Sequence, residues 1–320
     1  MNKEKIDLLI EKIADAKTIL IFGHKNPDGD ALGASLGLRF LINDNFGKNP
    51  DVIYDGNLPF IYDFVPGRAD MVYVEKMPAK KYDLVISLDS PAPRMIGEAQ
   101  MAFFNAAADT VKIDHHKTDA DCDFAALNIS DTNFVATAEM IYEIAKAMDW
   151  KISVDAANCL YVGIYTDTGG FNYVDNGNAM RVAADLVDMG VDARNMQPNL
   201  NLCTAGDIIA QGSALANTEF FYGGKLAVTM ISNKQYKKLD SGQTTLLMRL
   251  RDVKGVRALA ILKEAKPEEI HASLRSETTP IRGVAEKLGG GGHDFSAAAN
   301  LKMNLQSARD TVVEAFRGML

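Results

Sequence analysis

Short, mainly apolar segments alternate with segments of helical spacing over residues 1–190. The runs at 18–22, 83–88 and 110–113 predict buried strands. Helical spacing is found in five other segments, which are 1–17, 31–41, 137–148, 154–165 and 179–189. This alternation predicts an α/β fold, with a parallel sheet and helices on both of its faces. In such folds ligands bind at the carboxyl ends of the strands.

The rest of the chain predicts a helical connector and a second, smaller α/β domain. The connector is expected over 191–217 and the domain over 218–320. The domain opens with a hairpin pattern around Gly223 and Gly224. Its predicted strands are 219–222, 225–231, 257–262 and 270–274, and a glycine run at 289–292 precedes a last strand and a C-terminal helix.

Composition limits what the protein binds and where it works. The net charge of −8 disfavours broad binding of long duplex nucleic acid, but it is compatible with a small anionic substrate held by metals. No run approaches the ~18 apolar residues of a membrane span, and the N-terminus lacks the apolar stretch of a signal peptide. Cys122, Cys159 and Cys203 are sparse and far apart, which predicts buried thiols in a reducing, cytoplasmic compartment.

The segment after the first predicted strand is the richest in chemistry. It reads Gly-His-Lys-Asn-Pro-Asp-Gly-Asp over residues 23–30. In an extended turn, Asp28 and Asp30 can point both carboxylates toward one locus, and Gly29 permits the unusual backbone this needs. His24 can reach the same locus from the strand end. The alternative is a solvated Asp-Gly turn without a ligand.

Three further acidic or imidazole elements stand at the ends of predicted strands or helices. Asp89 closes an apolar run, where a carboxylate is either a helix cap or a ligand. Asp114, His115 and His116 close the third strand. Adjacent histidines on an extended backbone face opposite sides, so one of them shares a ligand locus unless the chain turns there. Asp167 ends a helical segment, where an anion opposes the helix dipole and a bound cation would resolve the conflict.

Six of these side chains form a candidate ligand set, namely His24, Asp28, Asp30, Asp89, His115 and Asp167. The set is too large for one structural zinc and contains no thiolate. Mixed carboxylate and imidazole ligands suit a pair of harder cations, Mn²⁺ or Mg²⁺, and ligand type alone does not separate the two. Because such a pair activates water for attack on phosphorus, the sequence predicts a phosphoesterase with two divalent cations.

Candidate substrate-binding residues lie in the second domain. Arg275 and Ser276 end a predicted strand, and a guanidinium binds phosphate in a bidentate manner. A glycine run that ends in a histidine follows, made of Gly290, Gly291, Gly292 and His293. Its backbone amides can approach a phosphate closely. The alternative is a flexible loop beside a surface arginine.

In their order along the chain, these motifs resemble the DHH phosphoesterase superfamily, in the branch that carries a DHHA1 domain. The resemblance runs from His24 to about Ala299. It implies a DHH catalytic domain over 1–190, a DHHA1 substrate-binding domain over 218–320, and an active site in the cleft between them. A free-standing chain of this size resembles the nano-RNase and pAp phosphatase group. That group releases 5′-mononucleotides from short oligoribonucleotides and converts 3′-phosphoadenosine 5′-phosphate (pAp) to AMP.

The resemblance also implies a role for each matched residue. The cation ligands would be His24 and Asp28 for the first metal, Asp30, His115 and Asp167 for the second, and Asp89 as the bridge. His116 would contact the scissile phosphate or help the leaving oxygen, and Asp114 would orient the site from behind. The substrate would be held by Arg275, Ser276, Gly290, Gly291, Gly292 and His293.

Two positions depart from the family pattern Gly-Gly-Gly-His-x-x-Ala-Ala-Gly. Ser296 replaces the first alanine and Ala298 the last glycine, where a methyl group crowds the backbone. This departure concerns the grip on the substrate and not the metal ligands.

Two other functions are consistent with the same residues. One is a phosphodiesterase for pApA or cyclic di-AMP. The other is a binding module that has lost catalysis, which the six filled ligand positions disfavour. The expected partner is short RNA or a small nucleotide, with no long duplex and no membrane, and the sequence leaves a homodimer open.

Overall fold

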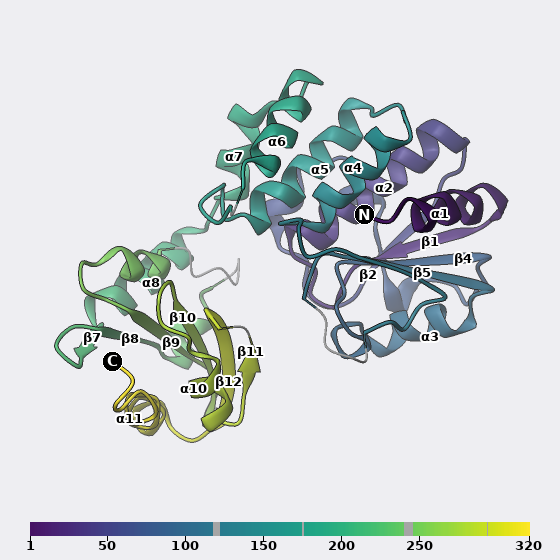
Figure 1. Cartoon of the computed structure of the whole chain (residues 1–320). Helices are drawn as coiled ribbons and strands as arrows, with labels where there is room; N and C mark the ends of the chain where they lie inside the picture. Colours follow the sequence, from purple (N-terminus) through teal and green to yellow (C-terminus); the bar gives the residue numbers. More distant parts are fainter. Residues whose placement is uncertain (118–121, 175, 240–245, 293) are drawn as a thin grey trace. The chain divides into compact units, whose positions relative to one another are not determined.

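The computed structural model describes residues 1–117, 122–174, 176–239, 246–292 and 294–320 (Figure 1). The chain divides into two compact units, Met1–Leu202 and Cys203–Leu320. The division falls within the segment for which the sequence predicts a helical connector. Within the described residues, no helix is both long and apolar enough to cross a lipid bilayer.

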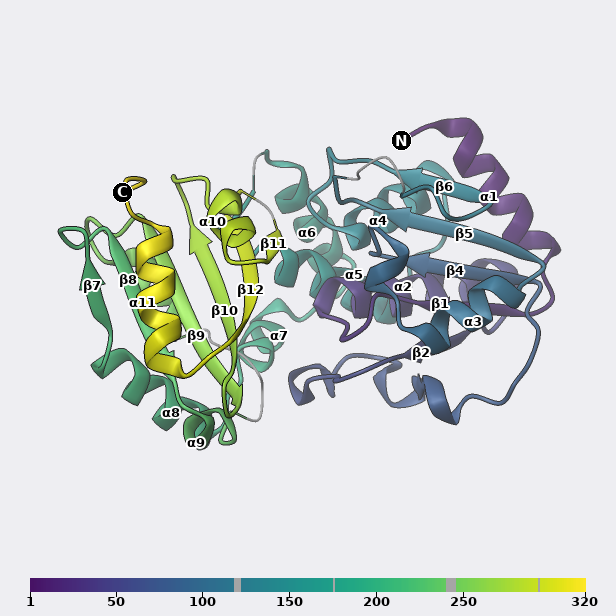
Figure 2. The ribbon, with the colours of Figure 1, turned by 90° about the horizontal axis from the view of Figure 1, so that it is seen from below.

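The first unit is built on a parallel sheet of six strands in the order β3-β2-β1-β4-β5-β6 (Figure 2). The strands are β1 (Ile19–Phe22), β2 (Asp51–Tyr54), β3 (Val72–Tyr73), β4 (Leu84–Leu88), β5 (Asp109–Asp114) and β6 (Leu127–Ser130). From β1 the chain adds strands on one side, and from β4 it adds them on the other. The strand order therefore reverses between β1 and β4, which is where parallel α/β sheets bind ligands.

Helices cover both faces of this sheet, as the alternating pattern predicts (Figure 1). The helices of this unit are α1 (Lys3–Asp15), α2 (Gly29–Phe46), α3 (Glu98–Ala106), α4 (Thr137–Ala147), α5 (Val154–Asp167), α6 (Asn178–Asp188) and α7 (Ala193–Leu200). Ile21 and Ile86 pack into the core beneath α2, α4 and α5. Phe22 and Val85 point to the opposite face, where they pack with Phe104 of α3. Successive strand residues face opposite sides, so each buried strand supplies both cores.

Glycines bring α2 and α5 unusually close together. Gly29 and Gly33 lie four residues apart on α2. A Cβ atom at Gly33 would lie 2.4 Å from the backbone oxygen of Cys159 on α5, far inside van der Waals contact. The close approach places Asp30, at the start of α2, within ligand distance of Asp167, at the end of α5. The packing of these two helices thus builds part of the site.

The second unit contains a mixed sheet in the order β11-β12-β10-β9-β8-β7. Its strands are β7 (Glu219–Phe221), β8 (Leu226–Ile231), β9 (Ala258–Lys266), β10 (Glu269–Ser276), β11 (Gly291–Gly292) and β12 (Ser296–Lys302). Its helices are α8 (Ala205–Ala216), α9 (Asn233–Tyr236), α10 (Arg282–Lys287) and α11 (Leu305–Ala315). The predicted hairpin is confirmed, because β7 and β8 pair antiparallel. Gly223 and Gly224 both have positive φ in its turn.

Candidate metal centre

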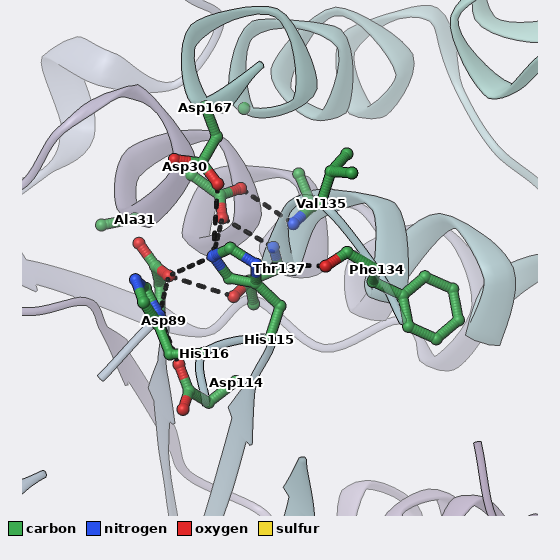
Figure 3. Close-up of polar contacts among 12 residues, drawn as sticks. Asp30, Ala31, Asp89, Asp114, His115, His116, Phe134, Val135, Thr137 and Asp167 are labelled. Atoms are coloured by element: carbon green, nitrogen blue, oxygen red, sulfur yellow. Dashed lines mark hydrogen bonds and ion pairs between the residues drawn. The ribbon is translucent and has the colours of Figure 1, made fainter. Parts of the chain in front are cut away.

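The six candidate ligands converge at the carboxyl ends of three adjacent strands. Figure 3 shows four of them, Asp30, Asp89, His115 and Asp167. His24 follows β1, Asp89 follows β4 and His115 follows β5. The strands β1, β4 and β5 are neighbours in the sheet, so their ends meet at one place. Asp30 and Asp167 reach the same place from α2 and α5. The convergence therefore follows from strand order and from the close packing of two helices.

One group of ligand atoms comes from His24, Asp28 and Asp89, and these atoms lie within 4.8 Å of one another. His24 Nε2 is 3.6 Å from Asp28 Oδ2 and 3.7 Å from Asp89 Oδ2. The other oxygen of Asp28 caps α2 by accepting hydrogen bonds from the amides of Asp30 and Ala31. His24 Nδ1 lies 2.9 Å from the carbonyl of Lys25, so a proton on Nδ1 leaves Nε2 as the ligand atom.

A second group comes from Asp30, His115 and Asp167. His115 Nε2 is 3.2 Å from Asp167 Oδ2 and 4.0 Å from Asp30 Oδ2. His115 Nδ1 faces the carbonyl of Phe134 at 3.3 Å, which again leaves Nε2 free to bind. This Nε2 atom is buried and makes no hydrogen bond to any described residue. A buried imidazole nitrogen without a partner, aimed at two carboxylates, is the arrangement of a metal ligand.

Backbone amides at the start of α4 fix the carboxylate of Asp30. The amides of Thr137 and Ala138 donate to Asp30 at 2.6 and 2.9 Å. A helix N-terminus favours a negative charge, so the start of α4 fixes the orientation of the Asp30 carboxylate and favours its ionised form. The Thr137 hydroxyl also donates to Asp89 Oδ1 at 3.2 Å. Sequence reasoning missed both α4 residues, although the position of Thr137 at the start of a predicted helix was a signal.

Asp89 belongs to the first group and also faces the second. Its Oδ2 atom faces His24 Nε2, and its Oδ1 atom is 3.6 Å from His115 Nε2. The side chain is buried, and the backbone has a left-handed φ of 52°. A non-glycine residue in this region is strained by about 1 kcal/mol, and Asp and Asn tolerate the conformation best. The local backbone is therefore held in an uncommon state that keeps this carboxylate between both groups.

His115 and His116 lie on the same side of the chain, with ring centroids 4.2 Å apart. The opposed arrangement expected of an extended backbone does not occur, because β5 ends at Asp114 and the chain turns at once. His116 Nδ1 is 2.9 Å from Asp114 Oδ1 and 3.4 Å from Asp89 Oδ1. The Asp114 and Asp89 carboxylates therefore both face the Nδ1 atom of His116.

Crowding perturbs the acidity of the carboxylates. Burial, reinforced by repulsion from Asp28, raises the pKa of Asp30 to about 7. Burial and repulsion from Asp30 raise the pKa of Asp167 to about 8. Burial and the same neighbours raise the pKa of Asp89 well above its usual value. For the half-exposed Asp28, the partial loss of solvent is outweighed by its hydrogen bond to His24 and by that residue's charge, so its pKa is lowered.

These carboxylates cannot all be ionised together without nearby positive charge. Bound metal cations would supply that charge, and oxygen and imidazole donors are the ligands that hard cations take. The donor set and the buried nitrogen of His115 therefore fit a metal centre.

Asp28 and Asp30 enter different ligand groups of the same centre, Asp28 that of His24 and Asp30 that of His115. One geometric expectation about the first motif is wrong. Gly29 is not needed for an unusual backbone, since it lies in the first turn of α2. It is needed for space, because a Cβ atom there would lie 2.3 Å from Thr166 Oγ1.

The predicted substrate-binding residues lie in the second unit. Arg275 is on β10, and its guanidinium donates to the carbonyls of Leu274 and Ala297. The Ser276 hydroxyl donates to the Arg257 carbonyl and accepts from two backbone amides, so it is engaged in holding the strand end.

The glycine run packs closely against β12. A Cβ atom at Gly290 would lie 2.0 Å from the carbonyl of Ala298, and Gly292 has a φ of 136°. Gly291 pairs with Ala298 across the ladder between β11 and β12. The fold therefore requires glycine at positions 290 and 292, whereas a Cβ atom at Gly291 would meet nothing within 4 Å. His293 lies outside the described residues.

Comparison with known proteins agrees with this architecture. The family model for the N-terminal domain of the DHH family matches residues 18–164, and the model for the DHHA1 domain matches residues 223–318. The bifunctional oligoribonuclease and PAP phosphatase NrnA of Mycoplasma genitalium is 30% identical over 304 residues, which cover 93% of each chain. The chain belongs to the DHH family and carries a DHHA1 domain.

Other relatives of this DHH protein extend over its whole length. The NrnA protein of Thermus thermophilus is 30% identical and covers 98% of this chain and 94% of its own. The solved structure of an exopolyphosphatase-related protein from Bacteroides fragilis superposes with a TM-score of 0.89 at 25% identity, covering 98% of this chain and 97% of the other. The cyclic-di-AMP phosphodiesterase GdpP of Geobacillus thermodenitrificans is 25% identical, and the match spans 46% of that protein.

Proposed function

We propose that this protein is a phosphoesterase that uses two divalent cations, Mn²⁺ in the first instance, to hydrolyse short oligoribonucleotides to 5′-mononucleotides and pAp to AMP. The observation that carries the proposal is the placement of Asp89 between two groups of histidine and carboxylate ligands. The substrate class is supported by the relatives named oligoribonuclease and PAP phosphatase, which match nearly the whole chain.

Each group would hold one cation. His24 and Asp28 would bind the first, and Asp30, His115 and Asp167 the second, with Asp89 shared between them. The chemistry that such a pair supplies is polarisation of a phosphate ester and activation of a water molecule. The pairing of each histidine Nδ1 with a backbone carbonyl supports this assignment, because it presents both Nε2 atoms to the centre.

The remaining residues of the centre would act on the substrate directly. His116, held at Nδ1 by Asp114, would direct Nε2 toward the scissile phosphate. In the imidazolium form, which is protonated on both nitrogens, Nε2 would donate a hydrogen bond to the leaving oxygen. Asp114 fixes the ring and does not touch the substrate. In the second unit, Arg275 and the glycine run are proposed to bind a phosphate group of the nucleotide.

A substrate panel tests the proposal and separates it from the alternative. Purified protein is incubated with Mn²⁺ or Mg²⁺ and with pAp, pApA, RNAs of graded length, cyclic di-AMP or pyrophosphate, and kcat/KM is compared. We expect the highest values for pAp and the shortest RNAs, with no turnover after chelation. The match to GdpP makes a preference for pApA or cyclic di-AMP the alternative outcome. Turnover that persists in EDTA contradicts the metal-dependent mechanism.

A further inference from the structure

A fully buried lysine lies behind the histidine pair. Lys112 is on β5, two residues before Asp114, so both side chains leave the same face of the sheet. The side chains of Lys112 and Asp114 are each 0% exposed. Lysine is almost never completely buried unless its charge is paired. The buried ammonium of Lys112 therefore needs a charged or polar partner, and its partners indicate what it does beside the candidate metal centre.

The contacts of Lys112 join two parts of the chain. Its ammonium donates a hydrogen bond to the carbonyl of Cys122 at 3.0 Å and lies 5.6 Å from the ring centroid of Phe124. It also lies 3.6 Å from Asp114 Oδ2. That oxygen is buried and makes no hydrogen bond to any described residue, so the ammonium provides its compensating charge.

The other oxygen of Asp114 faces His116. Asp114 Oδ1 lies 2.9 Å from His116 Nδ1, so the carboxylate stands between a buried ammonium and an imidazole. We propose that Lys112 is a positioning residue: it fixes the Asp114 carboxylate so that His116 carries its proton on Nδ1 and directs Nε2 toward the substrate. The inference rests on the proposed function only for the task of His116, and the orientation itself can be measured without turnover.

Removal of the ammonium has a defined consequence. Asp114 would remain buried with one oxygen uncompensated, and such a carboxylate is free to rotate or to lose its fixed hydrogen bond. His116 would then sample both tautomers and more than one ring orientation. The cation ligands have their own partners in Lys25, Phe134, Thr137 and Ala138, so metal binding should change little.

The test compares Lys112→Met with a matched control on the same strand and face. Methionine keeps the length of the side chain and removes its charge. The control is Thr110→Val, because the Thr110 hydroxyl accepts from the amide of Ala126 and so anchors the same returning segment without touching Asp114. The measurements are kcat and KM for pAp with saturating Mn²⁺, Mn²⁺ affinity by calorimetry, and the side-chain ¹⁵N spectrum of the metal-free protein.

For Lys112→Met we expect kcat to fall about 10- to 100-fold, the range typical when a supporting partner of a metal site is lost. KM and Mn²⁺ affinity should stay near their wild-type values. The His116 nitrogen signals should change from one tautomer to a mixture, while Thr110→Val should alter neither kcat nor the spectrum. In an Asp114→Asn background, Lys112→Met should lower kcat little further, because the two residues act through the same contact.

Three results would overturn the inference. They are an unchanged His116 spectrum in Lys112→Met, an equal loss of kcat in Thr110→Val, or additive losses in the double variant. If Lys112→Met does not fold, Lys112→Gln retains a donor for the Cys122 carbonyl and permits the same comparison. A wild-type protein that hydrolyses no nucleotide refutes the proposed function, whereas the His116 spectra still decide the role of Lys112.

Discussion

Asp89→Asn tests two roles of this carboxylate separately, namely its electrostatic cost to the stability of the metal-free protein and its contribution to turnover. The substitution keeps the shape of the side chain and its tolerance of the left-handed backbone at φ 52°. It removes one negative charge from a group in which the Asp28 and Asp89 oxygens lie within 4.8 Å. Stability and activity should therefore change in opposite directions.

The size of the effect follows from the geometry. Two unit charges about 5 Å apart repel by about 3 kcal/mol at an effective dielectric constant of 20. Asp28 is 54% exposed, so solvent screens part of this repulsion, and proton uptake by Asp89 itself, whose pKa is raised, and by its neighbours relieves more of it. We expect the free energy of unfolding of the metal-free variant to rise by ~1–2 kcal/mol. Each kcal/mol corresponds to a rise in Tm of roughly 2–4 °C. Loss of the shared ligand should lower turnover by ~100-fold or more.

The assay is thermal unfolding in EDTA and in Mn²⁺, together with release of phosphate from pAp. Asp89→Ala is the control for the backbone. It removes the same charge, but alanine at this φ costs about 1 kcal/mol, so its gain in Tm should be smaller. A metal-free Asp89→Asn protein that melts below the wild type, or one that turns over pAp at nearly the wild-type rate, would refute the reasoning.

Three further predictions address packing, substrate binding and metal binding. Gly33→Ala should lower the free energy of unfolding, measured in urea, by about 1–3 kcal/mol, because its Cβ atom would meet the Cys159 carbonyl. The control Gly212→Ala lies in an open part of α8 and should raise the free energy of unfolding by about 0.5–1 kcal/mol, so equal effects of the two variants would contradict the close-packing argument. Arg275→Ala should raise KM for pAp about 10-fold, the loss of one charged hydrogen bond, with kcat and manganese content unchanged, and depleted manganese in elemental analysis would count against it. Mn²⁺ at about 100 times its dissociation constant should stabilise the EDTA-treated wild type by about 2.7 kcal/mol, and a Tm that ignores Mn²⁺ would be inconsistent with a metal centre.

Much of the fold could be predicted from periodicity. The strands β1 and β4 are short, mainly apolar runs, β5 is a largely buried run that contains Lys112, and the helices α4, α5 and α6 have clear helical spacing. Both kinds of element were therefore identified near their observed bounds. The elements β2, β3, β6 and α3 were not identified. These strands have at most four residues and are only partly buried, which leaves a weak pattern.

The candidate site could be predicted as a set of residues but not as an arrangement. The candidate ligands were proposed because each follows a predicted strand or ends a predicted helix, where parallel α/β folds bind ligands. Their supporting contacts span long stretches of chain. The amide of Thr137 meets Asp30 across 107 positions, and no local pattern encodes that meeting. Lys112 was missed for the same reason, since its partners lie on a segment that returns beside it.

The sequence by itself determined the chemical types of the ligands, their order along the chain and the strands that carry them. These properties are local, because a strand or a helix is encoded by the spacing of its own apolar residues. Only the tertiary structure decided that Asp28 joins His24, that Asp30 joins His115 and Asp167, and that Asp89 lies between the two groups. Those pairings depend on strand order and on how closely α2 approaches α5, and both are set by packing between residues far apart in the chain.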